Sequence, residues 1–137
     1  MVIDSPADTV WSTVRDFHDV SWASGVLRSC EAVGAKTGDQ VGAKRILNGV
    51  FHETLVQLSD TRRTLRYTLD EGPSPVSSDD IANYVSRLRV FRITEGGGAF
   101  VEWSSSWDAK DDAACDFCHV IYVALLGQLR KTLLQRV

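Results

Sequence analysis

Arg45 and Glu53 are the two charged residues whose types and spacing could support acid-base chemistry. In the segment 41–48 the side chains alternate, and Arg45 shares the more apolar face with Leu47. In the next segment the alternation does not decide whether Glu53 or His52 faces inward. With Glu53 inward, the two charges would pair across neighbouring strands. Such a pair is either a structural salt bridge or a site where burial raises the pKa of a carboxyl group for general acid-base work.

Aromatic and aliphatic residues of the same strands are predicted to surround this pair. Alternation places Tyr67, Tyr84 and Trp103 on the inward face. Together with the final helix, they predict an apolar pocket with a few convergent polar groups, suited to a small hydrophobic molecule. The residues expected to line it are Trp103, Phe51, Leu47, Leu65, Leu88, Phe117 and Ile121.

Short alternating segments separated by turn residues predict the elements that position these side chains. We expect a short helix over 6–15 and a further helical turn over 16–22. Six strands are predicted over 28–34, 41–48, 50–59, 63–70, 83–94 and 99–108, and a long amphipathic helix over 111–137. Asn48-Gly49 predicts a tight hairpin, and short connections of this kind join antiparallel strands. The segment 71–82 is either an inert solvated loop or a lid.

Four segments resemble the polyketide cyclase/dehydrase branch of the START-like (SRPBCC) superfamily: Ile3 to Trp11, Val41 to Gly49, Glu53-Thr54-Leu55 and Leu65 to Leu69. The resemblance covers essentially the whole chain and implies an α+β helix-grip fold. In that fold a curved antiparallel sheet of six to seven strands wraps round a long C-terminal helix. The chain departs from the family pattern in a shorter hairpin between Arg45 and Glu53. The first strand of the pattern, which ends at Ile3-Asp4, is almost absent.

The resemblance also implies roles for individual residues. Within the branch, the sequence is similar to the plant lachrymatory factor synthases, whose important arginine and glutamate correspond to Arg45 and Glu53. Tyr67, Tyr84 and Trp103 correspond to their pocket aromatics, which favours the inward orientation of Glu53. We expect Glu53, Arg45, Tyr67 and Tyr84 to be catalytic in a cofactor-independent cyclase, dehydratase or isomerase acting on a hydrophobic or polyketide-like substrate. The alternatives are a non-catalytic carrier of a hydrophobic ligand, and an interaction domain whose cavity is filled by side chains.

The cysteine and histidine residues raise the question of a haem, redox or metal site as an alternative to the Arg45–Glu53 pocket. Cys115-Asp116-Phe117-Cys118-His119 spells the attachment motif of c-type haem, and its two thiols could also form a redox pair. The motif lies inside the predicted long helix, so we favour buried helix cysteines instead. His18, His52 and His119 lie on separate elements, and we therefore predict no metal site.

The composition of the chain limits its domain number, its possible partners and its expected localisation. The chain has 137 residues, three cysteines and a net charge of -3, which predicts a single domain over 1–137 with free thiols. Basic residues are scattered among acidic ones, so we expect no nucleic-acid partner. No apolar run is long enough to span a membrane and the first residues do not form a signal peptide, so we expect a cytoplasmic protein with no membrane partner. It is expected to be a monomer or homodimer.

Overall fold

One antiparallel sheet contains all the strands of the computed structural model, which describes residues 1–136. The order of its seven strands is β1-β7-β6-β5-β4-β3-β2. The strands are β1 (Val2–Ile3), β2 (Cys30–Val33), β3 (Lys44–Leu47), β4 (Phe51–Ser59), β5 (Thr64–Glu71), β6 (Ile81–Arg92) and β7 (Ala99–Ala109). The helices are α1 (Ala7–Val14), the short 3₁₀ helix η1 (Ser21–Ala23) and α2 (Ala113–Gln135).

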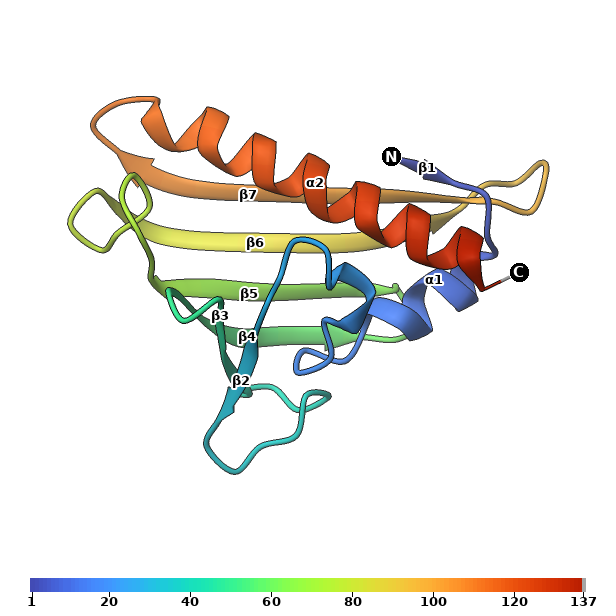
Figure 1. Ribbon diagram of the computed structural model, residues 1–137, viewed down its shortest axis with the longest axis horizontal. Helices are drawn as coiled ribbons and strands as arrows, with labels where there is room; N and C mark the ends of the chain where they lie inside the picture. Colours follow the sequence, from blue (N-terminus) through green and yellow to red (C-terminus); the bar gives the residue numbers. More distant parts are fainter. Residues whose placement is uncertain (137) are drawn as a thin grey trace.

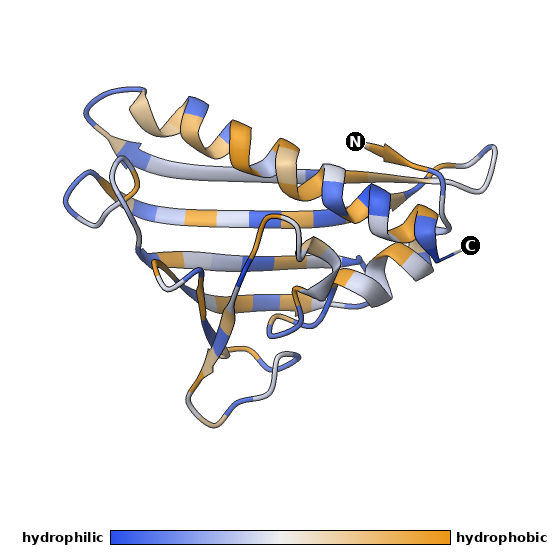
Figure 2. Ribbon diagram, viewed as in Figure 1, coloured by the Kyte–Doolittle hydropathy of each residue, from blue (hydrophilic) through white to orange (hydrophobic). Residues whose placement is uncertain are grey.

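The long helix α2 crosses one face of the sheet, with α1 and η1 beside it near its C-terminal half (Figure 1). Apolar residues recur along α2 and along the strands (Figure 2). The buried residues of α2 are Ala114, Cys118, Leu125, Leu126, Leu129 and Leu133. A sheet gripping a long C-terminal helix is the α+β helix-grip arrangement, which confirms the expected fold class.

The hairpin between β3 and β4 sets the geometry of the charged pair. Asn48 and Gly49 both have positive φ, 51° and 70°, and the Val50 amide donates to the Leu47 carbonyl at 3.0 Å, so the predicted tight turn is confirmed. This turn places Leu47 opposite Phe51 and Arg45 opposite Glu53. A one-residue slip would turn Glu53 to the other face of the sheet.

A very short strand forms the N-terminal edge of the sheet. Val2 and Ile3 form a short strand that pairs with Phe100 and Ala99 of β7. The first strand, expected to be almost absent, is thus only two residues long, and with it the sheet has seven strands. At the other edge, β3 begins only at Lys44 although a strand was predicted from residue 41, and Val41 is 53% exposed.

The loop between β5 and β6 is anchored by one apolar residue. Val76 is buried and belongs to a cluster with Ile81, Tyr84, Ala114 and Cys118. The loop therefore packs against the end of the sheet and the start of α2.

Candidate active site

Arg45 and Glu53 form a buried ion pair on the inward face of the sheet. Arg45 Nε donates to Glu53 Oε1 at 2.8 Å, and the two side chains are only 9% and 8% exposed. Their strands hold them directly opposite one another, so the pair is built by the β3–β4 register. Removing either partner would leave an uncompensated buried charge.

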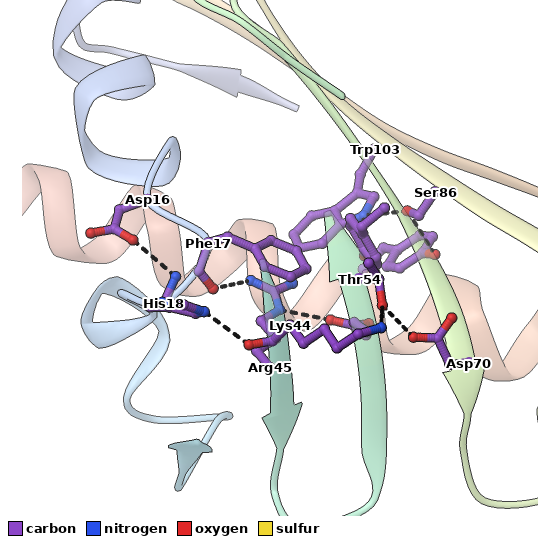
Figure 3. A network of polar contacts seen from close by, with 12 residues as sticks. Asp16, Phe17, His18, Lys44, Arg45, Thr54, Asp70, Ser86 and Trp103 are labelled. Atoms are coloured by element: carbon purple, nitrogen blue, oxygen red, sulfur yellow. Dashed lines mark hydrogen bonds and ion pairs between the residues drawn. The ribbon is translucent and has the colours of Figure 1, made fainter. Parts of the chain in front are cut away.

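The guanidinium of Arg45 is fixed on its other sides by the segment that follows α1. Its Nη1 donates to the Phe17 carbonyl at 3.0 Å, and its Cζ lies 3.8 Å from the Phe17 ring centroid. The neighbouring His18 bonds through Nε2 to the Lys44 carbonyl (Figure 3). Tyr67 closes the next side, with its ring centroid 5.2 Å from Arg45 Cζ. Arg45 is thus held between β3 and the loop by charge, hydrogen bonding and cation–π contact.

Burial dominates the ionisation of Glu53. The pKa of Glu53 is raised above its ordinary value because desolvation of the buried carboxylate outweighs the attraction of Arg45. Arg45 occupies Oε1, and within residues 1–136 no hydrogen bond reaches Oε2. A carboxyl group at the cavity wall with a raised pKa and a free oxygen can both accept and return a proton.

A cavity of about 60 Å³ lies between the sheet, η1 and α2. By volume it has room for a few water molecules or a small ligand. Its wall is mostly apolar, and the charged pair lies at one side of it. The lining residues are Val20, Trp22, Leu27, Arg45, Leu47, Phe51, Glu53, Tyr67, Leu69, Tyr84, Trp103, Cys118, Ile121, Tyr122 and Leu125.

Hydroxyl and indole groups form a network along this wall. Trp103 Nε1 donates to Ser86 Oγ at 2.9 Å and to Tyr67 Oη at 3.1 Å. Ser86 Oγ donates to the Ser104 carbonyl at 3.2 Å, so its lone pairs are free to accept from Trp103 and from Tyr122, whose hydroxyl lies 3.3 Å away. The Tyr122 hydroxyl is in turn bonded to that of Tyr84. The network fixes the orientation of the aromatic rings that bound the cavity.

The tyrosines of the wall are neutral hydrogen-bonding groups near neutral pH. The pKa of Tyr67 is raised because the phenol is buried and because the Glu53 carboxylate is close. Burial likewise raises the pKa of Tyr84 and of Tyr122. These groups can donate hydrogen bonds to a ligand oxygen but cannot serve as phenolate bases.

Most of the predicted site residues meet at the cavity, and three do not. The charged pair, both tyrosines, Trp103, Phe51, Leu47 and Ile121 line it. Leu65 and Leu88 lie opposite one another on β5 and β6, buried in the core beyond the cavity. Phe117 is half-buried and its ring centroid lies 6.5 Å from that of Phe51. Alternation identifies the buried face of a strand but not which part of that face borders empty space.

Seven residues of the cavity wall were not predicted from the sequence to line it: Val20, Trp22, Leu27, Leu69, Cys118, Tyr122 and Leu125. Tyr122 follows Cys118 by four residues and precedes Leu125 by three, so helical spacing could have identified it. Trp22 ends the segment predicted as a short helical turn, and no sequence signal placed it against the sheet. Its buried indole Nε1 has no hydrogen-bond acceptor among residues 1–136.

The cysteine motif lies within α2, as expected. Cys115 is exposed, whereas Cys118 is buried with its Sγ 3.9 Å from the Tyr84 hydroxyl. Burial raises the pKa of the Cys118 thiol, which makes it a poor nucleophile. Across residues 1–136, no three His, Cys, Asp or Glu side chains are grouped to hold a metal ion.

Helix-grip proteins with this type of cavity form a broad class, and the comparisons with known proteins identify the family. The family model described as polyketide cyclase/dehydrase and lipid transport matches residues 1–134. The chain belongs to this family, within the SRPBCC-type proteins. The family and fold are those of proteins that bind hydrophobic molecules.

Solved structures share the fold over 95–98% of the chain. A protein of Nitrosospira multiformis is 44% identical, with a TM-score of 0.94 and coverage of 96% of this chain and 90% of that one. A protein of Thermobifida fusca is 24% identical, with a TM-score of 0.78 and coverage of 95% and 87%. A Bacillus thuringiensis protein is also 24% identical, with a TM-score of 0.79 and coverage of 98% and 95%. The last two show the fold alone.

The comparisons stop at the level of family and fold. No curated protein sequence matches this chain. The finer likeness to the lachrymatory factor synthases therefore stays a prediction. In the part of the chain that the structure describes, no helix is both long and apolar enough to cross a membrane.

Proposed function

We propose that the protein is a cofactor-independent enzyme of the cyclase, dehydratase or isomerase type, acting on a small hydrophobic or polyketide-like molecule in the cavity. The observation that carries this proposal is the buried Glu53, whose pKa is raised and whose Oε2 accepts no hydrogen bond from residues 1–136. Structural ion pairs also occur in cores, but they are stabilising only when the remaining polar atoms are satisfied. Glu53 lines the cavity, and the lack of a partner for its Oε2 among residues 1–136 supports a chemical role.

In this mechanism Glu53 moves a proton within the substrate. The ionised carboxylate takes a proton from carbon next to a carbonyl group, and an enol or enolate forms. The protonated carboxyl then returns the proton. In an isomerisation the proton goes to a different carbon. In a cyclisation the enolate carbon bonds to a second carbonyl carbon, and the proton goes to the alkoxide that this addition creates. In a dehydration the proton goes to a hydroxyl group that leaves as water. A carboxyl group whose pKa is raised above its ordinary value is better suited to both steps than an ordinary one.

Arg45 and the tyrosines assist without exchanging protons. Arg45 holds Glu53 in place and offers positive charge to developing negative charge on oxygen. Tyr67 and Tyr84 are neutral and can donate hydrogen bonds. Trp103 provides a flat wall, since its ring is stacked on Tyr122 with centroids 5.0 Å apart. The cavity excludes bulk water, which strengthens each of these interactions.

Proton transfer can be tested with a small ketone, because its α-hydrogens exchange with solvent only through the enol. We expect the protein to accelerate deuterium uptake by cyclopentanone in D₂O, followed by proton NMR. Glu53→Gln should slow the catalysed exchange by about 10²-fold or more. Unchanged exchange in Glu53→Gln would refute the acid-base role.

Glu102→Gln is the matched control. Glu102 pairs with Arg87 at 2.6 Å on the opposite face of the sheet, where both side chains are more than a third exposed. This variant removes a carboxylate from an arginine pair but leaves the cavity intact. Its exchange rate should equal that of the wild type.

The second candidate is a carrier that binds a hydrophobic molecule without chemistry. It is favoured by the family description, which includes lipid transport, and by the mostly apolar wall. A carrier should retain its cargo, so native mass spectrometry of the protein purified from its source would show a bound small molecule. A carrier should also give the same slow ketone exchange with and without Glu53.

A further inference from the structure

We propose that the protein forms an antiparallel homodimer through the solvent-facing side of α2, with the acidic start of one helix against the basic end of the other. The inference goes beyond the proposed function, because it concerns the side of α2 that faces away from the cavity.

The side of α2 turned away from the core is largely apolar. Val120, Val123 and Leu134 are exposed, and among residues 1–136 no other element carries as many exposed large apolar side chains. Figure 1 shows α2 lying over the sheet with no other described element across its outer side. The outer side of a surface helix is normally polar. Single exposed apolar residues are common, but several on one side of a helix indicate an interaction surface.

Helical spacing places these residues on one stripe. They follow one another at intervals of three and four, whereas the buried leucines of α2 lie on the opposite side. The apolar part of the stripe runs over about four turns, or about 20 Å. The outer stripe consists of Asp116, Val120, Val123, Ala124, Gly127, Lys131 and Leu134.

The middle of the outer stripe is shaped for close approach by another helix. Ala124 and Gly127 leave the helix backbone nearly bare there. A Cβ added to Gly127 would meet no atom within 4 Å, so the packing of this chain does not require glycine at that position. The distance between two packed helices depends on the side chains at the contact, and small residues allow the shortest distances.

The charges of the outer stripe are self-complementary in one orientation only. Asp116 lies near the start of α2 and Lys131 near its end, and neither forms an ion pair within the described part of the chain. Antiparallel pairing centred between Val123 and Ala124 brings Asp116 of each copy opposite Lys131 of the other. Parallel pairing would instead bring like charges together.

The same antiparallel register matches large residues to small ones. It places Val120 of one copy opposite Gly127 of the other, and Val123 opposite Ala124. Both contacts occur twice, as the two-fold symmetry of a homodimer requires. The shape and the charge of the outer stripe therefore favour the same occupant, which is a second copy of this chain.

Sedimentation equilibrium of the full chain tests the inference. One helix face buries less surface than a standard interface, so we expect a weak dimer. The weight-average mass should rise from that of one chain toward that of two between about 10 μM and about 1 mM, a range that covers weak affinities. A mass that stays at that of one chain throughout would overturn the inference.

Val123→Glu tests whether the dimer uses the outer stripe. This variant would bury a charge at the centre of the interface and should weaken dimerisation by about tenfold or more. Val41→Glu is the matched control, because Val41 is 53% exposed against 50% for Val123 but lies outside α2. It should dimerise as the wild type does. Dimerisation of Val123→Glu at the wild-type level would assign the dimer to another surface and overturn the inference.

A charge exchange tests the antiparallel arrangement. Asp116→Lys and Lys131→Glu each bring like charges together twice in the dimer, so each variant alone should dimerise about fivefold more weakly or worse. An equal mixture of the two variants restores both opposite-charge contacts and should dimerise like the wild type. Both substitutions are on exposed side chains, and circular dichroism of the dilute variants checks that they are folded.

Two further results would contradict the inference. A mixture that associates no better than the separate variants would rule out the antiparallel contacts between Asp116 and Lys131. A chain that stays monomeric and binds phosphatidylcholine vesicles, with binding lost in Val123→Glu, would assign the outer stripe to a lipid surface.

Discussion

At the scale of single residues, the Arg45–Glu53 pair is the least replaceable feature of the site. A buried pair balances two desolvated charges, and truncating one partner leaves the other without compensation. We predict that Arg45→Met lowers the free energy of unfolding by about 3–5 kcal/mol. Urea denaturation at neutral pH, followed by circular dichroism, would measure this change.

The exposed Arg87–Glu102 ion pair on the other face of the sheet serves as the comparison for the buried pair. Arg87 and Glu102 lie on the solvent side, 37% and 38% exposed, where water screens their attraction. Arg87→Met should change the free energy of unfolding by no more than about 1 kcal/mol. Equal losses in the two variants would mean that the Arg45–Glu53 pair is not effectively buried.

At the scale of elements, the loop between β5 and β6 is closed by Glu71. Its carboxylate accepts hydrogen bonds from Ser78 Oγ and from the Ser78 and Gly72 amides, which lower its pKa to about 2. A lowered pKa means that the ionised form is favoured by folding, so this contribution is complete above the ordinary value and is lost as the pH falls toward 2.

Glu71→Gln should therefore loosen this loop at neutral pH. We predict faster hydrogen exchange of the Gly72 and Ser78 amides, while amides in the centre of β5 stay protected. Asp79→Asn, an exposed change in the same loop, is the control. Equally slow exchange in Glu71→Gln and the wild type would show that Val76 alone anchors the loop.

Most of the strands and helices were predictable from the sequence. The places where the prediction failed have physical causes. Period-two alternation, the Asn48-Gly49 turn and helical spacing identified six strands and α2. Alternation could not choose between His52 and Glu53, since both alternating sets of β4 contain apolar residues. It also fails at the irregularity between Ala82 and Val85, where Asn83 has a φ of 58°. The resemblance to the family resolved the first ambiguity, and the register of the structure agrees with it.

At the scale of the whole molecule, the cavity exists because α2 and η1 do not fill the space over the sheet. Neither alternation nor helical spacing measures that gap, so the sequence could not separate cavity residues from core residues. Leu65 and Leu125 illustrate the difference, because both are almost fully buried but only Leu125 borders the cavity.

Truncating each of these two leucines to alanine tests whether only Leu125 borders the cavity. Leu65→Ala and Leu125→Ala should each lower the free energy of unfolding by about 2–5 kcal/mol. Only Leu125→Ala should increase the affinity for larger cyclic ketones relative to cyclopentanone, as measured by NMR titration. The same size preference in both variants would contradict the assignment of the cavity wall.

The central claim is that burial prepares Glu53 for proton transfer despite its contact with Arg45. The most direct measurement is a ¹³C NMR titration of the Glu53 side-chain carboxyl, assigned by its disappearance in Glu53→Gln. We predict that the pKa lies above the ordinary value of 4.5 and rises further in Arg45→Met, if that variant is folded. A pKa at or below 4.5 in the wild type would show that Arg45 dominates and that the pair is a structural salt bridge.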